Sequence, residues 1–154
     1  QTHRVAHHLY KQGRQSLAGL LQSRSSEMFH VDIHPAARVG KGIMMDHATG
    51  VVMGESTVVG DNVSMLHHVT LGGSGKSGVD RHPKIGSGVL IGAGAVVLGN
   101  VRVGNCSKIG AGSVVINEVP PRHVAVGVPA RNIPLNKNTP VPVNSMDSRF
   151  DFDI

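Results

Sequence analysis

The stretch GGSGKSGVDRHPKIG, residues 72–86, combines several glycines with three basic side chains and one histidine. Arginine and lysine bind carboxylate and phosphate groups, and histidine exchanges protons near neutral pH. Almost none of these residues can be buried in an apolar core. We therefore expect a loop that carries polar chemistry and projects from a scaffold.

The remaining reactive residue types argue against thiol and metal chemistry. Cys106 is the single cysteine, so the sequence predicts neither a disulfide framework nor a thiolate cluster for zinc, which fits a reducing, cytoplasmic compartment. It lies in VGNCSK, a regular stretch without a catalytic motif, so we do not expect it to act as a nucleophile. His67 and His68 are neighbours, and on a strand they would point to opposite faces. We therefore expect no metal.

The composition narrows the class of partner. The chain has 154 residues, enough for one main domain, and a formal net charge of +5, which favours anionic partners. The basic residues are scattered and only 3% of residues are aromatic, so a phosphate-bearing small molecule fits better than nucleic acid. No apolar run approaches the roughly 20 residues of a membrane span, and no signal peptide is visible.

A six-residue period dictates the scaffold that must position these groups. From Ile85 onward every sixth residue is aliphatic, and glycine usually follows it. Two earlier registers have the same period, separated by a two-residue slip, and eight extra residues follow Leu71. Such hexads predict a parallel β-helix. The first positions are Ile33, Val39, Met45 and Val51; then Met53, Val59, Met65 and Leu71; then Ile85, Ile91, Val97, Val103, Ile109 and Val115.

Three hexads form one triangular coil, and coils stack at the usual strand spacing of about 4.8 Å. The first-position side chains then point inward and bury one another, and glycines serve the corners. Residues 1–27 have helical spacing of apolar residues, with Gly13 a break between two helices. After Pro134 the chain becomes rich in Pro, Asn and Ser, which predicts a flexible tail. The period itself does not fix the hand of the coils.

Two stretches, VDIHPAARVGKGIMMDHATG (31–50) and TLGGSGKSGVDRHPKIG (70–86), resemble the signature of the serine acetyltransferases, a hexapeptide-repeat acyltransferase family. The resemblance covers residues 1 to about 133. It implies a left-handed β-helix and a large N-terminal helical domain that is mostly missing here, so we expect a piece of a longer protein. The expected parts are a helical remnant (1–27), a catalytic β-helix (28–133) with a loop excursion at about 73–84, and a flexible tail (134–154).

The resemblance also implies a reaction, the transfer of acetyl from acetyl-CoA to the hydroxyl of L-serine. It makes His47, in DHATG, the general base and Asp32, in VDIHP, the carboxylate that orients it. The two are fifteen residues apart, close to the eighteen of one coil, which permits contact across adjacent coils. Because no activated nucleophile is evident, we expect direct transfer within a ternary complex.

The same resemblance assigns the binding residues. Arg81 and His82 would hold the amino acid, with Arg81 on its carboxylate, and Asp46 would take its ammonium group. Acetyl-CoA would lie in a groove between neighbouring β-helices. The residues implied for it are Gly73, Ala93, Ala111 and, for a nucleotide phosphate, Lys108.

The expected partners follow from the family as well. They are a second and third copy in a homotrimer, with a dimer of trimers in the longer protein, L-cysteine as a feedback inhibitor, and O-acetylserine sulfhydrylase. The sulfhydrylase would be bound through the C-terminal Ile154.

Three alternatives stay open at this point. A zinc-dependent γ-class carbonic anhydrase also uses a β-helix trimer, but its histidine pattern is not evident. A fragment with weak catalysis would act mainly as a docking module for the sulfhydrylase. A related hexapeptide acetyltransferase would use another acceptor, such as a sugar.

Overall fold

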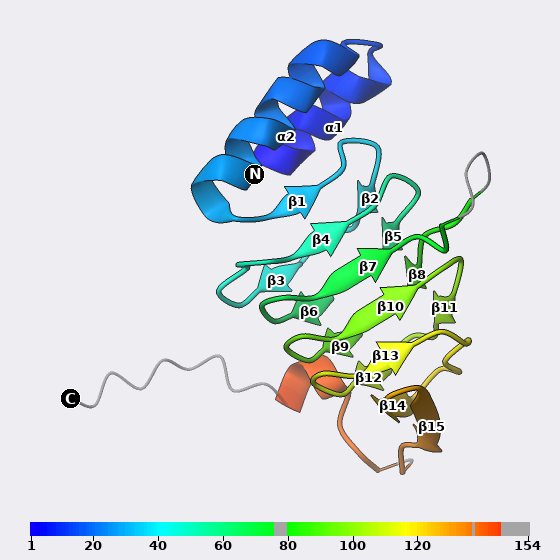
Figure 1. The fold of residues 1–154 in the computed structure, drawn as a ribbon. Helices are drawn as coiled ribbons and strands as arrows, with labels where there is room; N and C mark the ends of the chain where they lie inside the picture. Colours follow the sequence, from blue (N-terminus) through cyan, green and yellow to red (C-terminus); the bar gives the residue numbers. More distant parts are fainter. Residues whose placement is uncertain (76–79, 137, 146–154) are drawn as a thin grey trace.

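Two helices lie over the first coil of a parallel β-helix in the computed structural model of the chain (Figure 1). The structure describes residues 1–75, 80–136 and 138–145. Part of the expected excursion and about half of the expected tail, with Ile154, lie outside the described residues, so the expectations for them are not addressed by the fold.

The helices are α1 (Thr2–Lys11) and α2 (Gln15–Phe29). They are separated at Gly13, which has a φ of 80°, a left-handed conformation that glycine adopts at no steric cost. This break agrees with the sequence prediction. The helices bury the small residues Ala6 and Ala18, which lets them lie close together. None of the described helices is long and apolar enough to cross a membrane.

Each of the first four coils contributes one short strand to each of three sheets, and β13 begins a fifth coil. The first sheet has the order β1-β4-β7-β10-β13, the second β11-β8-β5-β2 and the third β15-β14-β12-β9-β6-β3. The strands of the prism are β1 (Asp32–Ile33), β2 (Arg38–Val39), β3 (Met44–Met45), β4 (Val52–Met53), β5 (Val58–Val59), β6 (Ser64–Met65), β7 (Thr70–Gly72), β8 (Lys84–Ile85), β9 (Leu90–Ile91), β10 (Val96–Leu98), β11 (Arg102–Val103), β12 (Lys108–Ile109) and β13 (Val114–Val115).

The register confirms the period and both interruptions. In the first sheet the paired positions run Asp32, Val52, Thr70, Val96 and Val114. The steps between them are 20, 18, 26 and 18 residues, so two coils have the regular eighteen. The first coil holds the two-residue slip, and the eight inserted residues lie in the third coil, between β7 and β8.

The inward side chains form the core as predicted. All six first-position residues from Ile85 to Val115 are at most 3% exposed, as are Met53, Val59, Met65 and Leu71 of the second register. Each buried aliphatic side chain contributes about 1.5 to 3 kcal/mol. Ile33, Val39 and Met45 of the first coil are only half-buried, because the helices cover that end incompletely.

An antiparallel hairpin closes the other end, a feature that the hexad period did not predict. It consists of β14 (His123–Gly127) and β15 (Ala130–Pro134), followed by the short 3₁₀ helix η1 (Pro142–Ser145). β14 pairs with β12, and β15 pairs with β14. The hairpin therefore covers a strand edge that would otherwise end the stack unpaired.

Candidate active site

His47 lies at the corner between β3 and β4, where the two-residue slip falls. Six residues separate these strands, whereas four separate β6 from β7, β9 from β10 and β12 from β13. Both His47 (φ 60°) and Ala48 (φ 56°) have left-handed backbones, so the extra residues widen the turn. The imidazole projects outward, with 75% of its side chain exposed.

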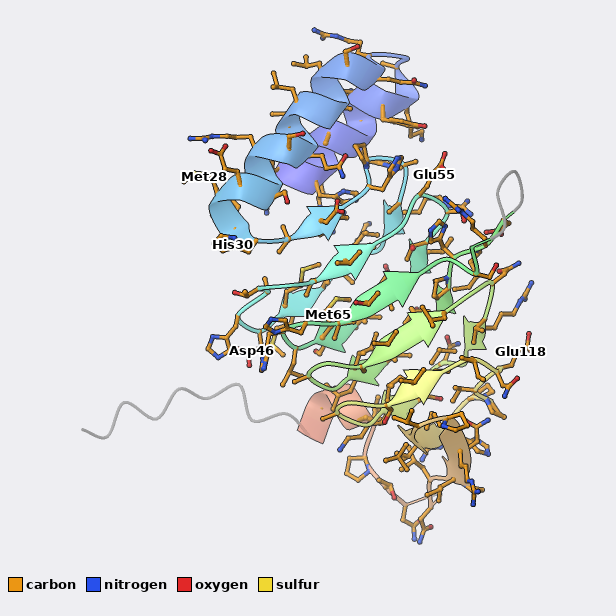
Figure 2. The ribbon with its side chains drawn as sticks, in the orientation of Figure 1. Met28, His30, Asp46, Glu55, Met65 and Glu118 are labelled. Carbon is orange, nitrogen blue, oxygen red and sulfur yellow. The ribbon has the colours of Figure 1, made fainter. Side chains whose placement is uncertain are left out.

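A cavity of about 890 Å³ opens beside His47, between the C-terminal end of α2 and the first coil. Its walls are apolar for the larger part, and its polar groups come from the first residues of the chain, Gln1 to Arg4, and from the corner that carries His47. The residues include Met28, Phe29, His30, Ile33, Ile43, Met45, His47, Ala48 and Thr49. Figure 2 shows Met28 and His30 at the end of α2, over the edge that carries Asp46. The cavity therefore gives a small substrate access to the imidazole.

One edge of the prism, here the His47 edge, stacks four of these corners. Ser64, Leu90 and Lys108 are paired in register, so His67, Ala93 and Ala111, three positions later, lie above one another. Thr49 has the equivalent place in the first coil, because the amide of His68 donates to its carbonyl as the amide of Gly94 donates to that of His67. His47 is one of the extra residues of this corner. The rings of His47 and His67 meet edge to face, with centroids 6.1 Å apart. Lower down, the amide of Gly112 donates to the carbonyl of Ala93 at 2.8 Å.

Asp32 opens β1 and its carboxylate is engaged by another residue. It accepts a hydrogen bond of 2.6 Å from the Gln22 side chain on α2. Among the described residues no hydrogen bond or ion pair joins Asp32 to His47. The carboxylate recorded near His47 is that of Asp46, 3.9 Å from Nε2. The contact between Asp32 and His47 therefore stays a prediction.

Arg81 and His82 lie at a different edge, after the first sheet. We call it the His82 edge and define it by Glu55, Gly73, Arg81 and His82. His82 is 6% exposed, and its Nδ1 lies 2.9 Å from Ser56 Oγ. Gly73 packs against the ring, where an added Cβ would come within 3.1 Å of Nε2.

Burial lowers the pKa of His82 below its ordinary value, and the charges of Arg81 and Lys84 lower it further. The imidazole is therefore neutral at neutral pH. The ammonium group of Lys84 also links the residues around His82. It donates hydrogen bonds to Asp80 Oδ1 at 2.6 Å, to the His82 carbonyl at 2.7 Å and to the Ser56 carbonyl at 2.9 Å. The hydrogen bond from Lys84 lowers the pKa of Asp80.

Within one chain the two edges stay apart. Asp46 precedes β4 and Glu55 follows it, and Figure 2 shows them on opposite sides of the prism. The candidate residues thus divide into two groups. Asp46, His47, Ala93 and Ala111 follow the His47 edge, with Lys108 exposed on the strand before Ala111; Gly73, Arg81 and His82 form the other group.

Sequence reasoning missed several residues that support these groups. Gln22 binds Asp32, Ser56 holds His82, and His67 lies under His47 with a buried Nδ1 that has no hydrogen-bond partner among the described residues. The step of 20 residues between His47 and His67 was the available signal for the last of these. The described residues contain no group of three or more His, Cys, Asp or Glu side chains able to hold a metal ion.

The fold and the repeat define a class of protein, the hexapeptide-repeat transferases with a left-handed parallel β-helix. A family model described as "Bacterial transferase hexapeptide (six repeats)" matches residues 82–117. The chain is homologous to the serine acetyltransferases over nearly all of its own length. It is 64% identical to "Probable serine acetyltransferase 1" of Oryza sativa subsp. japonica, covering 96% of this chain and 48% of that protein. It is 56% identical to "Serine acetyltransferase" of Escherichia coli strain K12, covering 97% and 55%.

Solved structures of serine acetyltransferases are also similar to this chain. The soybean serine acetyltransferase complexed with serine has a TM-score of 0.84 and 66% identity, covering 86% of this chain and 54% of that chain. The Brucella abortus strain S19 serine acetyltransferase in complex with coenzyme A has a TM-score of 0.86 and 64% identity, covering 90% and 55%. The chain therefore spans about half the length of the relatives it matches.

Proposed function

We propose that this chain is the β-helical part of a serine O-acetyltransferase, which makes O-acetylserine for cysteine biosynthesis. The observation that carries the proposal is the 66% identity to a structure solved with serine, together with an outward imidazole at the mouth of a cavity. We divide the chain into helical residues 1–27, a catalytic β-helix at 28–133 and a tail at 134–154, and place it in the cytoplasm.

In the proposed reaction His47 accepts the proton of the serine hydroxyl as its oxygen attacks the carbonyl carbon of acetyl-CoA. The carbon–sulfur bond then breaks, and the CoA thiolate leaves and takes the proton back from His47. Direct transfer is supported by the place of Cys106, which lies between β11 and β12 and so off the His47 edge. No acyl-enzyme and no metal enter this scheme.

Asp32 would orient His47 only after exchanging its hydrogen bond to Gln22 for one to the imidazole. Asp46 would hold the serine ammonium group, and Arg81 and His82 would hold its carboxylate. Because these residues lie on two edges, we propose that the site forms between two copies of a homotrimer, with Ala93, Ala111, Lys108 and Gly73 along the acetyl-CoA groove. In the longer protein two trimers would join.

The test is a thiol-release assay with acetyl-CoA and one acceptor at a time. We expect CoA release with L-serine, little with homoserine or a galactoside, and inhibition by L-cysteine if the serine pocket also takes the inhibitor. Release with the galactoside alone would favour the related acetyltransferase. No release with any acceptor from folded protein would leave the docking module as the better description.

The partner proposal concerns the C-terminus. We propose that Ile154 inserts into the active site of O-acetylserine sulfhydrylase, as the retained terminal isoleucine suggests. Deleting Ile154 should abolish sulfhydrylase binding in calorimetry and leave acetylation unchanged. Equal binding after the deletion would refute the proposal.

A further inference from the structure

A second cleft adjoins the His47 cavity, with which it shares His3, Arg4 and Val39, and six of its nine lining residues are His, Lys or Arg. It has a volume of about 510 Å³ and lies between α1 and the strands β2 and β5. One wall is a face of α1, and the other is the strand end at Arg38, Val39 and Gly40. We name it the basic cleft; its residues are His3, Arg4, His7, His8, Lys11, Arg38, Val39, Gly40 and Val59.

The helix supplies these groups because of its period. Residues three and four positions apart lie on one face of an α-helix, so His3, His7 and Lys11 follow one row and Arg4 and His8 the next. Arg38 faces them from β2. Five basic positions of one short helix are thus turned toward a sixth on the β-helix.

Arg4, one of the lining residues, is held in place by the backbone of the β-helix. Its guanidinium donates to the carbonyl of Val39 at 3.3 Å and to that of Gly40 at 2.6 Å. A guanidinium has five N–H donors, so donors remain for a ligand. His7 is likewise oriented, because its Nδ1 lies 2.8 Å from the carbonyl of Pro35, which leaves Nε2 at the opposite side of the ring.

The cleft lacks a compensating acid. Its lining contains no Asp or Glu, and neither Lys11 nor Arg38 forms an ion pair with any described residue. The recorded acid at the rim is Asp61, which accepts a hydrogen bond of 2.7 Å from the amide of Lys41. Elsewhere Arg24 is paired with Glu27 and Lys84 with Asp80.

We propose that the basic cleft binds a small ligand with two or more linked phosphates, such as a nucleoside triphosphate or inorganic polyphosphate. Three permanent cations, Arg4, Lys11 and Arg38, line the cleft and no acid does, which favours an anion of more than one charge. The volume lies in the range of small-molecule sites, about 300 to 1,000 Å³. Both kinds of ligand contain a chain of linked phosphates, and the experiment distinguishes a nucleotide from inorganic polyphosphate.

The experiment is calorimetric titration of the folded protein with sodium tripolyphosphate and, separately, with ATP. We expect saturable binding of both at low salt. Removing one cation from a charge-assisted contact should weaken it about tenfold, and raising the ionic strength to about 0.3 M should weaken it further. Tighter binding of ATP would identify a nucleotide site, and equal binding a polyphosphate site.

The variants are Lys11→Gln and Arg38→Gln, both at exposed positions outside the catalytic proposal. The matched control is Arg102→Gln. Arg102 opens β11 as Arg38 opens β2, at the far end of the same sheet. We expect the control to bind both probes as the wild type does. The proposal is wrong if neither probe binds at about 1 mM, or if Arg102→Gln weakens binding as much as Arg38→Gln.

Coenzyme A itself carries phosphates, so it provides a second control. Saturating coenzyme A should leave tripolyphosphate binding unchanged, because the proposed acetyl-CoA groove follows other residues. Displacement by coenzyme A with no effect of Arg38→Gln would place the anion in that groove and overturn the proposal. Because the titration does not measure acetyl transfer, its failure is distinguishable from failure of the proposed function.

Discussion

The backbone at His47 follows from the slip in the repeat rather than from strain peculiar to a catalytic residue. Left-handed backbones recur at the corners of this prism, at Asn62, His68 and Cys106 as well as at several glycines. A side chain in this conformation costs about 1 to 2 kcal/mol. At His47 and Ala48 the cost falls on the two extra residues, which carry the imidazole outward to the cavity.

This geometry allows a test of His47 that does not disturb folding. His47→Asn and His47→Ala should each lower kcat by about 10² to 10⁴, the usual effect of losing a general base. Asn tolerates a left-handed backbone, so His47→Asn should also keep the melting temperature of the wild type. Thiol release measures kcat, and calorimetry should show little change in acetyl-CoA affinity. Unchanged turnover in either folded variant would remove His47 from the mechanism.

At the scale of single residues, the sequence predicted which residues form the candidate site but not which residues contact them. The sequence motifs named His47, Asp32, Arg81 and His82, and the structure places the first at a cavity. The hydrogen bond from Gln22 to Asp32 joins a helix to a strand, and no repeat rule brings these two residues together.

At the scale of the elements, the period predicted the stack because each inward residue has one geometric role in a coil. It also predicted the slip and the inserted loop, since both interrupt the count. The closing hairpin was not predicted, because β14 and β15 (His123–Pro134) follow no hexad count and β15 pairs antiparallel. The sequence also did not predict how the first coil is covered, since this depends on how α1 and α2 pack against it.

The docking of α1 makes a prediction about acid stability through His3. Burial lowers the pKa of His3 to about 4, and the charge of His7 contributes. Between pH 4 and 6.5 the unfolded chain therefore binds more protons than the folded one. The full shift corresponds to about 3 kcal/mol, of which water around the partly exposed ring leaves only a part.

The free energy of unfolding should therefore be complete above about pH 7 and fall as the pH drops from 6.5 toward 4. His3→Gln should flatten this part of the profile, measured by urea unfolding at each pH. His8→Gln, at an exposed position of the same helix, is the control and should keep the wild-type slope. An unchanged slope in His3→Gln would show that His3 does not couple folding to protons.

At the scale of the whole molecule, the division of the site between two edges has a direct consequence. A single prism presents the His47 edge and the His82 edge on opposite sides of its first sheet. A closed ring of three identical prisms brings one edge of each copy against the other edge of the next. Each site would then take His47 from one copy and Arg81 from its neighbour.

Subunit mixing tests this arrangement. His47→Ala and Arg81→Ala should each be nearly inactive alone, but their mixed trimers, co-expressed with different tags, should recover up to about one third of the wild-type activity, since every trimer that holds both kinds of chain has one site of its three in which both groups are intact. Thiol release from the doubly tagged trimer is the measurement.

The matched control is the pair His47→Ala and Asp32→Ala, whose residues would act from the same chain. No mixed trimer contains a chain in which both groups are intact, so this mixture should recover nothing. If the first mixture also stays inactive while its trimers assemble, His47 and Arg81 serve one site within a single chain or do not share a site at all. Recovery in both mixtures would instead mean that Asp32 reaches His47 across the interface, because only then does an intact pair arise between neighbouring copies.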